Sequence, residues 1–248
     1  MRDVEWSKRL DAGGIKFKNL DLIGAKAVWV PDRSAAAKLA AYPGVVRVDD
    51  DIVVEALVKG GVPGRTAPTQ PAEVLPWGVD RIDAEKVWPN TADSIKVGII
   101  DTGISNTHPD LLANVEGGVN TINPLKSWND DNGHGSHVAG IIAALDNDIG
   151  VIGVGPAIVL YAIKVLDRNG SGFLSDVIEG IQWAVAKKMQ VINMSLGTAS
   201  DIQSFHDAVI AAKNAGVVVV AAAGNSVGSD AVIFPAAYPE AIAVSATD

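Results

Sequence analysis

The sequence predicts an α/β protein whose parallel β-sheet is covered by helices on both faces, preceded by a small α+β domain. From residue 95 onward, short runs of Val, Ile and Ala alternate with longer amphipathic segments, as in sheets built with crossover helices. The short runs are almost continuously apolar, which is typical of strands buried on both faces. A stretch rich in Gly, Pro and Thr at residues 59–78 separates this region from an N-terminal part with a different pattern.

The N-terminal part predicts five elements in order. They are a helix at residues 4–12, two strands within residues 15–30, a helix opened by Asp32, and a strand within residues 44–57. This order lacks only an initial strand to make a ferredoxin-like split βαβ unit. We therefore expect a ferredoxin-like α+β domain that begins after its own first strand.

These patterns divide the chain into three parts. We expect the small domain at residues 1–58, an exposed linker at residues 59–72 and the larger α/β domain at residues 73–248.

In the larger domain the helices are expected to start near His134, Ser175 and Asp201, with Gly216 following the last of them. Ser and Asp are common at helix starts and Gly at helix ends. The strands are expected at residues 95–101, 159–166, 191–197, 217–224 and 241–248. Functional sites in such folds gather at the carboxyl ends of the strands.

Composition excludes several classes of function. A net charge of −9 argues against a nucleic-acid surface, which needs clustered Lys and Arg. The chain has no cysteine, so neither a thiol nucleophile nor a disulfide framework is available. No apolar run is long enough to span a bilayer, and the charged N-terminus has no signal-peptide core, so we expect no membrane association.

Three polar residues stand at predicted strand ends or helix starts. Asp101 ends a buried strand, His134 begins a helix, and Asn225 follows the apolar run at residues 217–224. Each has an ordinary explanation, as a turn residue, a helix cap and a left-handed turn residue. His134 and His137 could instead bind a metal, but no third ligand is evident, and the helix of zinc proteases has the pattern H-E-x-x-H.

Together, the segments DTG (101–103), HGSHVAG (134–140) and AAAGN (221–225) resemble the subtilisin-like serine proteases of the S8 family. The resemblance implies a serine endopeptidase with an Asp-His-Ser triad. Asp101 would orient and support His134, and His134 would act as the general base for a serine hydroxyl. Asn225 would donate its amide to the developing oxyanion. His137, one helical turn further on, would be structural.

The resemblance also implies a substrate site. A peptide would add a strand between two segments of the chain, and an apolar or aromatic side chain would enter a pocket lined by small residues. Gly133 and Gly135 would leave room for the substrate beside His134. The flanking segments are Gly170, Ser171, Gly172 and Ser195, Leu196, Gly197; the pocket residues are Ala222, Ala223 and Gly224.

A structural calcium site is implied in the same way. Carboxylate, amide and carbonyl oxygens from a tight loop suit a hard cation. Glu73 replaces the family's usual Gln, which keeps an oxygen ligand and adds charge. Read without the resemblance, the segment LDNDIGV (145–151) is an ordinary turn. The implied ligands are Glu73, Asp110, Leu145, Asn147, Ile149 and Val151.

No serine in the sequence stands in the family's GTSMA-type context. Ser200, in GTAS, lies between a strand and a helix, where no helix-borne nucleophile is expected. We therefore expect a chain that stops before the catalytic serine, lacks the first strand of its propeptide and is inactive as given. A catalytically dead binding or inhibitory protein with the same scaffold, and an unrelated doubly wound hydrolase, remain as alternatives.

The resemblance implies partners as well. Residues 1–58 resemble an inhibitor I9-type propeptide, which would act as an intramolecular chaperone and inhibitor and be cut within the linker. We expect polypeptide substrates, no nucleic-acid or membrane partner, a monomeric state and, from the family alone, secretion.

Overall fold

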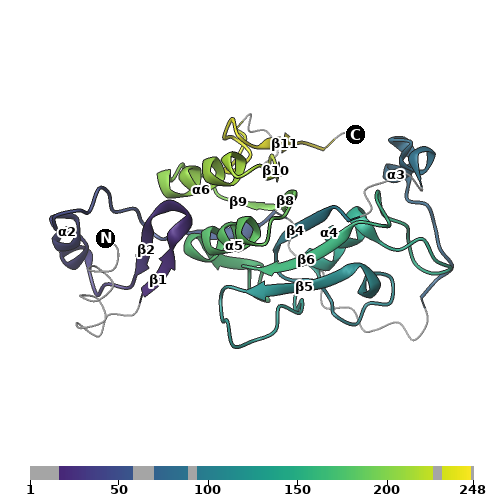
Figure 1. Ribbon diagram of the computed structural model, residues 1–248, viewed down its shortest axis with the longest axis horizontal. Helices are drawn as coiled ribbons and strands as arrows, with labels where there is room; N and C mark the ends of the chain where they lie inside the picture. Colours follow the sequence, from purple (N-terminus) through teal and green to yellow (C-terminus); the bar gives the residue numbers. More distant parts are fainter. Residues whose placement is uncertain (1–16, 58–69, 89–93, 226–230, 247–248) are drawn as a thin grey trace.

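The larger part of the molecule is built on a six-stranded parallel sheet with the strand order β11-β10-β8-β4-β6-β5. The computed structural model describes residues 17–57, 70–88, 94–225 and 231–246. The strands are β4 (Lys96–Asp101), β5 (Val115–Asn120), β6 (Val159–Lys164), β8 (Val191–Met194), β10 (Val218–Ala222) and β11 (Ile242–Val244). The predicted α/β fold with a parallel sheet is confirmed (Figure 1).

Helices cover both faces of this sheet. α5 (Leu174–Ala186) and α6 (Gln203–Asn214) pack on one face, and α4 (His134–Ala143) packs on the other. Successive residues of β4 serve the two faces, because side chains alternate along a strand. Ile100 joins the α5 and α6 side, and Ile99 joins the α4 side.

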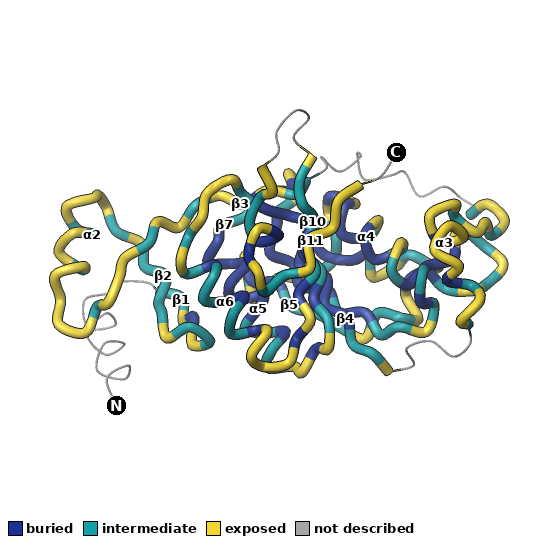
Figure 2. The backbone as a smooth tube through the Cα atoms, turned by 90° about the horizontal axis from the view of Figure 1, so that it is seen from above, coloured by how far each residue is buried: buried dark blue, intermediate teal, exposed yellow. Residues whose placement is uncertain are grey.

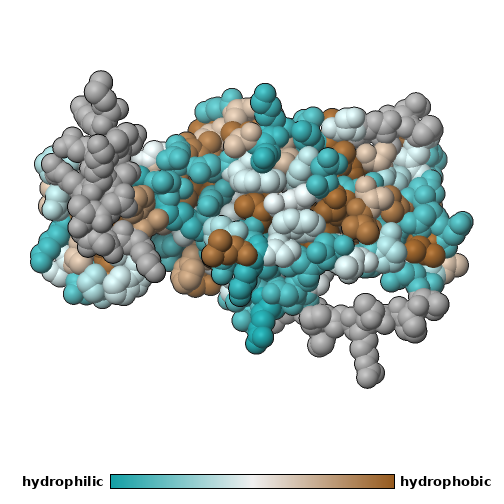
Figure 3. Space-filling model, turned by 60° about the horizontal axis from the view of Figure 1, so that its bottom comes forward, coloured by the Kyte–Doolittle hydropathy of each residue, from teal (hydrophilic) through white to brown (hydrophobic). Residues whose placement is uncertain are grey.

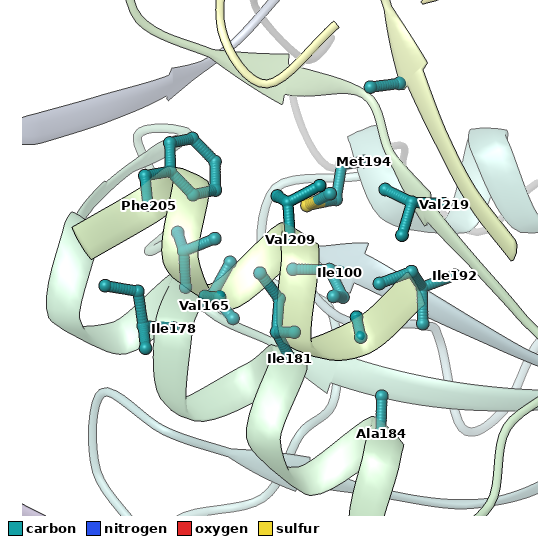
Figure 4. Packing of buried hydrophobic residues seen from close by; sticks show 14 of the residues in the cluster. Ile100, Val165, Ile178, Ile181, Ala184, Ile192, Met194, Phe205, Val209 and Val219 are labelled. Atoms are coloured by element: carbon teal, nitrogen blue, oxygen red, sulfur yellow. The ribbon is translucent and has the colours of Figure 1, made fainter. Parts of the chain in front are cut away.

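A cluster of buried hydrophobic side chains lies beneath α5 and α6. Figure 4 shows Ile181 of α5 and Val209 of α6 lying toward Ile100 and Ile192 of the sheet, with Ile178 of α5 further away in the same cluster. Each of these side chains is at most 2% exposed. Figure 2 shows that the buried backbone is concentrated around the sheet, whereas the segment around α2 is exposed.

Strand β5 was not predicted from the sequence. Its residues, VEGGVN, include two glycines, which weaken a strand pattern. The structure gives one of them a packing reason, because a Cβ on Gly118 would lie 2.2 Å from the Ala162 carbonyl oxygen and 2.8 Å from the Trp128 ring. β5 is one of the two edge strands of this sheet, and its register shifts between Val115 and Gly117.

The expected helix starts need correction. α5 begins at Leu174, so Ser175 already lies in its first turn, and α6 begins at Gln203, two residues after Asp201. The Asp201 carboxylate accepts a hydrogen bond from the Tyr238 hydroxyl instead of capping α6. The prediction at the other end of α6 holds, since Gly216 follows the helix with a φ of +86°.

The N-terminal part forms a two-stranded antiparallel sheet and one helix. β1 (Phe17–Leu20) pairs with β2 (Ala25–Val28), joined by the short helix η1 (Asp21–Ile23). In α2 (Arg33–Ala40) the Asp32 carboxylate accepts a hydrogen bond from the Ala35 amide at 2.8 Å, as expected for an N-cap. The predicted helix at residues 4–12 lies outside the described residues.

The third predicted N-terminal strand differs from expectation. Only β3 (Val53–Ala56) forms, and it does not join β1 and β2. It lies instead between β7 (Ser171–Phe173) and β9 (Leu196–Gly197), antiparallel to both. In the described residues, the three strands of a ferredoxin-like domain therefore do not form one sheet, because β3 makes its ladder with the larger domain.

Three short helices complete the described elements. These are α3 (Trp77–Arg81), η2 (Ala84–Val87) and η3 (Leu112–Asn114). Figure 1 shows α3 at the opposite end of the molecule from α2. On the face seen in Figure 3, hydrophobic residues form separate groups among hydrophilic ones. No helix in the described part of the chain is long and apolar enough to cross a membrane.

Candidate active site

A buried carboxylate and a buried imidazole meet at the carboxyl end of the sheet. Asp101 is the last residue of β4 and is 0% exposed, and His134 is the first residue of α4 and is 7% exposed. The His134 Nδ1 atom lies 2.7 Å from Asp101 Oδ1 and 2.9 Å from Oδ2. Because an ionised carboxylate only accepts, Nδ1 carries the proton, and Nε2 is the ring atom able to accept another.

Glycines allow this close approach of helix and strand. A Cβ on Gly135 would lie 2.1 Å from the Gly103 carbonyl oxygen, so α4 could not start against the end of β4 with any larger residue there. Gly133 has a φ of +103°. Gly135 thus serves the helix-to-strand contact and Gly133 a left-handed backbone, while room for substrate beside His134 stays a prediction.

The surroundings of His134 favour its charged form. Burial lowers the pKa of His134, but the hydrogen bond with Asp101 and the negative charges of Asp101 and Asp130 raise it, and the pKa ends above its ordinary value. An imidazole in this setting accepts a proton readily.

A strand from the N-terminal part, β3, lies between β7 and β9 as the middle strand of a three-stranded sheet. Val54 pairs with Gly172, Glu55 with both Ser171 and Gly197, and Ala56 with Leu196. The predicted substrate-binding segments, residues 170–172 and 195–197, thus flank an extended chain. It is the protein's own residues 53–57.

Asn225 contacts the chain just after β3. Its Nδ2 group donates a hydrogen bond to the Leu57 carbonyl oxygen at 2.8 Å. The Leu57 amide donates to the Ser195 carbonyl oxygen at 3.3 Å, and the Ala56 amide donates to that of Gly170 at 2.8 Å. Backbone hydrogen bonds therefore hold residues 53–57 on both edges, up to the Leu57 carbonyl that the Asn225 side-chain amide contacts.

Comparison with known sequences places these residues in a family. The profile of the Subtilase family (Peptidase_S8) matches residues 92–248. The chain belongs to the subtilase family.

Subtilases from several bacteria are similar to this chain. Subtilisin Savinase of Lederbergia lenta is 48% identical over 179 residues, covering 71% of this chain and 65% of that protein. Subtilisin amylosacchariticus of Bacillus subtilis subsp. amylosacchariticus is 39% identical over 244 residues, covering 96% and 60%. Minor extracellular protease Epr of Bacillus subtilis (strain 168) is 45% identical over 174 residues, covering 69% and 26%. The chain thus spans less than two thirds of each of these relatives.

The residues that the sequence analysis expects to line a substrate pocket, Ala222, Ala223 and Gly224, lie where β10 ends. The Ala223 carbonyl oxygen accepts a hydrogen bond from the Ile233 amide at 3.1 Å, and a Cβ on Gly224 would touch the Ile233 side chain at 3.4 Å. Ala222, Ala223 and Gly224 are all partly buried. The segment around Ile233 therefore lies against the small residues that the sequence assigns to the pocket.

His137 differs from its expected role. Its side chain is exposed, whereas the side chain of His134 is buried. The expectation that His137 packs its helix is not supported in the described structure.

The expected calcium ligands come together around Asp110, which is 2% exposed. Asp110 Oδ1 accepts from the Asn147 side-chain amide at 3.1 Å, Asp110 Oδ2 from the Val151 amide at 3.0 Å, and Glu73 Oε1 from the Asn147 backbone amide at 2.7 Å. This loop brings together two carboxylates, those of Asp110 and Glu73. Among the described residues, no group of three or more Asp, Glu, His or Cys side chains is placed to hold a metal ion.

Sequence reasoning missed the residues that join the segment before β3 to the larger domain. The Asp51 carboxylate accepts hydrogen bonds from the Ser175 amide at 2.8 Å and from the Ser175 hydroxyl at 2.7 Å. The Asp49 carboxylate accepts a hydrogen bond from the Ser204 amide at 3.0 Å. These are the first turns of α5 and α6, so carboxylates from the N-terminal part cap both helices. The run DDD (49–51) just before β3 was the available signal, because acidic residues suit helix N-termini.

Proposed function

We propose that this subtilase is a serine endopeptidase of the subtilisin type. The observation that carries the proposal is the buried Asp101–His134 pair, and the strand at residues 53–57 that ends on the Asn225 amide supports it. Family membership supports it. In the 248 residues no serine is assigned as nucleophile, and among the described residues no hydrogen bond joins a serine hydroxyl to the His134 ring.

In the proposed reaction, a serine oxygen bonds to the substrate carbonyl carbon while its proton passes to His134 Nε2. Asp101 stabilises the resulting imidazolium and keeps the Nδ1–H tautomer. The carbonyl oxygen becomes an oxyanion that the Asn225 amide stabilises. His134 then gives the proton to the departing amine as the C–N bond breaks, and water repeats the sequence to release the acid.

The strand at residues 53–57 supports an inhibitory role for the N-terminal part. Its backbone ladder and the Leu57 carbonyl contact are those expected of the acyl half of a bound substrate. We propose that maturation cuts the Leu57–Val58 bond, at the start of the linker instead of within residues 59–72. The side chain ahead of the cut would then be Leu, which agrees with an apolar pocket at residues 222–224.

We propose a calcium ion at the Asp110 loop, with the ligands expected from the sequence. The carboxylates and backbone carbonyls fit a hard cation, whereas the Asn147 side chain would have to turn, because its NH₂ group faces Asp110 and its oxygen accepts from the Ile149 amide at 2.8 Å. The carbonyl oxygens of Leu145, Ile149 and Val151 accept no hydrogen bond from the described residues, whereas those of Ala144, Asp148 and Gly150 do. Three unengaged carbonyls beside the Asp110 and Glu73 carboxylates are hard-cation ligands.

We further propose a secreted monomer that acts on polypeptides. One relative carries the word extracellular in its name. The net charge of −9 favours neither nucleic acid nor an anionic membrane surface as a partner.

The alternative function is that of a catalytically dead member of the family that binds a peptide strand without cutting it. A fluorophosphonate, which reacts with activated serines, separates the two. In a form extended after residue 248 with the family's serine-bearing segment, we expect labelling of one serine, lost in His134→Ala. An unlabelled extended form would favour the binding protein, and labelling within residues 1–248 would contradict the proposed triad.

A further inference from the structure

One carboxylate gathers the backbone on both sides of the Asp101–His134 pair. Asp130 Oδ1 accepts hydrogen bonds from the Thr102 hydroxyl and from the Asn132 and Gly133 amides, each at 2.9 Å. Asp130 Oδ2 accepts from the Ser136 amide at 3.0 Å and from the Ser136 hydroxyl at 2.6 Å. Five hydrogen bonds are more than most carboxylates in proteins accept.

The donors include the first turn of α4. The first amides of a helix have no partner within the helix, and an N-cap side chain usually satisfies one of them. The N-cap residue of α4 is Gly133, which has no side chain. Asp130 takes over this role from outside the helix, because it accepts from both Gly133 and Ser136.

The remaining donor belongs to the strand. Thr102 directly follows Asp101, and its hydroxyl accepts from the Gly135 amide at 2.9 Å while it donates to Asp130. Thr102 is 0% exposed. The Asp130 carboxylate thus connects the residue after Asp101 with the residues on either side of His134.

A buried lysine secures the same loop. Lys164 is 5% exposed, and its Nζ donates to the Thr102 carbonyl oxygen at 2.6 Å and to Asp131 Oδ1 at 2.7 Å. The Asp130 amide also donates to the Ile104 carbonyl oxygen at 3.2 Å. The backbone beside Asp130 is therefore tied to the end of β4 and its continuation at two further points.

We propose that Asp130 is a positioning residue for catalysis: by bridging Thr102 and the first turn of α4, its carboxylate sets the distance and angle between Asp101 and the His134 ring. This proposal depends on the proposed function only where it predicts an effect on catalysis. The geometry of the Asp101–His134 pair can be measured without any turnover of substrate. Asp130 does not touch the reacting atoms and acts through Thr102 and α4.

Charge adds a second effect. The ionised groups around His134 on this side are Asp101, Asp130, Asp131 and Lys164. The negative charge of Asp130 is one of the causes that raise the pKa of His134. Removing that charge should lower the pKa of His134.

The test is NMR of the His134 imidazole in the whole 248-residue chain, with its signals assigned by their loss in His134→Gln. In Asp130→Ala we expect the Nδ1 proton to exchange with water at least about tenfold faster and the His134 pKa to fall. Asp130→Asn keeps an acceptor for Thr102 and Gly133 but places an NH₂ group near Ser136, so we expect an intermediate exchange rate. Asp83→Asn, which removes an exposed carboxylate paired with Lys86, is the matched control and should behave as the unmodified chain.

Variants are compared under conditions where circular dichroism shows each one fully folded, and Asp130→Asn decides the matter if Asp130→Ala does not fold. A folded variant at residue 130 with unchanged proton exchange and unchanged His134 pKa would overturn the proposal. Failure of the proposed function would look different, because an extended form that carries a serine would then cleave no peptide while the effect of residue 130 on His134 remained.

Discussion

At the scale of single residues, the Asp101–His134 pair depends on glycine as much as on its own side chains. The hydrogen bond of 2.7 Å requires α4 to start against the end of β4, and Gly135 makes that contact possible because a Cβ would overlap the Gly103 carbonyl oxygen. Gly135→Ala should therefore disturb the pair although it adds only one carbon.

The raised pKa of His134 gives a prediction for stability. A group whose pKa is higher in the folded state stabilises that state when it is protonated, fully below its unfolded pKa of about 6.5, and the contribution is lost as pH rises through the folded pKa. His134→Gln keeps a hydrogen-bond donor but does not titrate. We expect the difference in unfolding free energy between the unmodified chain and His134→Gln to be larger at pH 5.5 than at pH 8.5.

Urea unfolding at the two pH values measures this difference. His206, which pairs with Glu240 at 2.8 Å, is the control histidine, and its Gln variant reports how much pH dependence arises outside the site. If the difference in unfolding free energy between the unmodified chain and His134→Gln grew as pH rose, the raised pKa assigned to His134 would be contradicted.

Sequence patterns located the catalytic candidates but not their support. Asp101, His134 and Asn225 stand out as polar residues at strand ends and helix starts, but their catalytic roles were expected only from the resemblance to subtilisin-like proteases. Asp130 lies in the run NDDNG (129–133), where any of several side chains could cap the helix. The choice between Asp130 and Asp131 depends on the path of the loop, which the sequence pattern does not specify.

At the scale of elements, the N-terminal part caps helices that belong to the larger domain. Asp51 binds the first turn of α5, and Asp49 binds that of α6 and pairs with Arg47. Asp50, between them, is exposed and makes no hydrogen bond or ion pair in the described structure. We expect Asp49→Ala and Asp51→Ala to lower the free energy of unfolding by about 1 kcal/mol each, the usual value of a helix cap.

Asp50→Ala is the matched control and should change the free energy of unfolding by less than about 0.5 kcal/mol, as is usual for exposed positions. Denaturant titrations of the three variants make the comparison. Equal effects at residues 49, 50 and 51 would show that the caps do not form in solution.

The Asp110 loop makes the calcium proposal testable. A ligand that binds only the folded state stabilises it by about 4 kcal/mol at a thousandfold excess over Kd. Melting temperatures in millimolar calcium and in chelator should therefore differ, and Asp110→Ala should remove most of the difference. Glu73→Gln should keep most of it, because an amide oxygen remains.

Asp146→Asn is the control for that experiment, since Asp146 is exposed in the same loop and is not among the proposed ligands. A melting temperature that does not respond to calcium would leave residues 145–151 as an ordinary turn.

At the scale of the whole molecule, the two predicted domains share a sheet. The small domain was predicted as a unit because its segments have the order of a ferredoxin-like fold. The sequence could not reveal that β3 pairs with β7 and β9, since strand partners over 100 residues away leave no local pattern. The buried, near-continuous strands of the larger domain were predictable for the opposite reason, that their composition alone indicates burial on both faces.

This arrangement predicts where the chain is cut. In an extended form that carries the family's serine, we expect N-terminal sequencing of the mature protein to begin at Val58, because the Leu57 carbonyl is the one that the Asn225 amide contacts. Leu57→Asp should slow the cut, since a charged side chain suits an apolar pocket poorly. A mature protein that begins within residues 59–72 would instead support the position expected from the sequence.

The central claim, that Asp101 and His134 form the base of a subtilisin-type endopeptidase, is tested most directly by hydrolysis of a chromogenic peptide with the sequence Val-Glu-Ala-Leu of residues 54–57. In the extended form we expect turnover that His134→Ala lowers by about 10⁶-fold, the loss known for subtilisin when its triad histidine is removed. His137→Ala, which changes an exposed histidine of the same helix, should retain nearly full activity. A folded His134→Ala protein that cleaves the peptide at the unmodified rate would contradict the account.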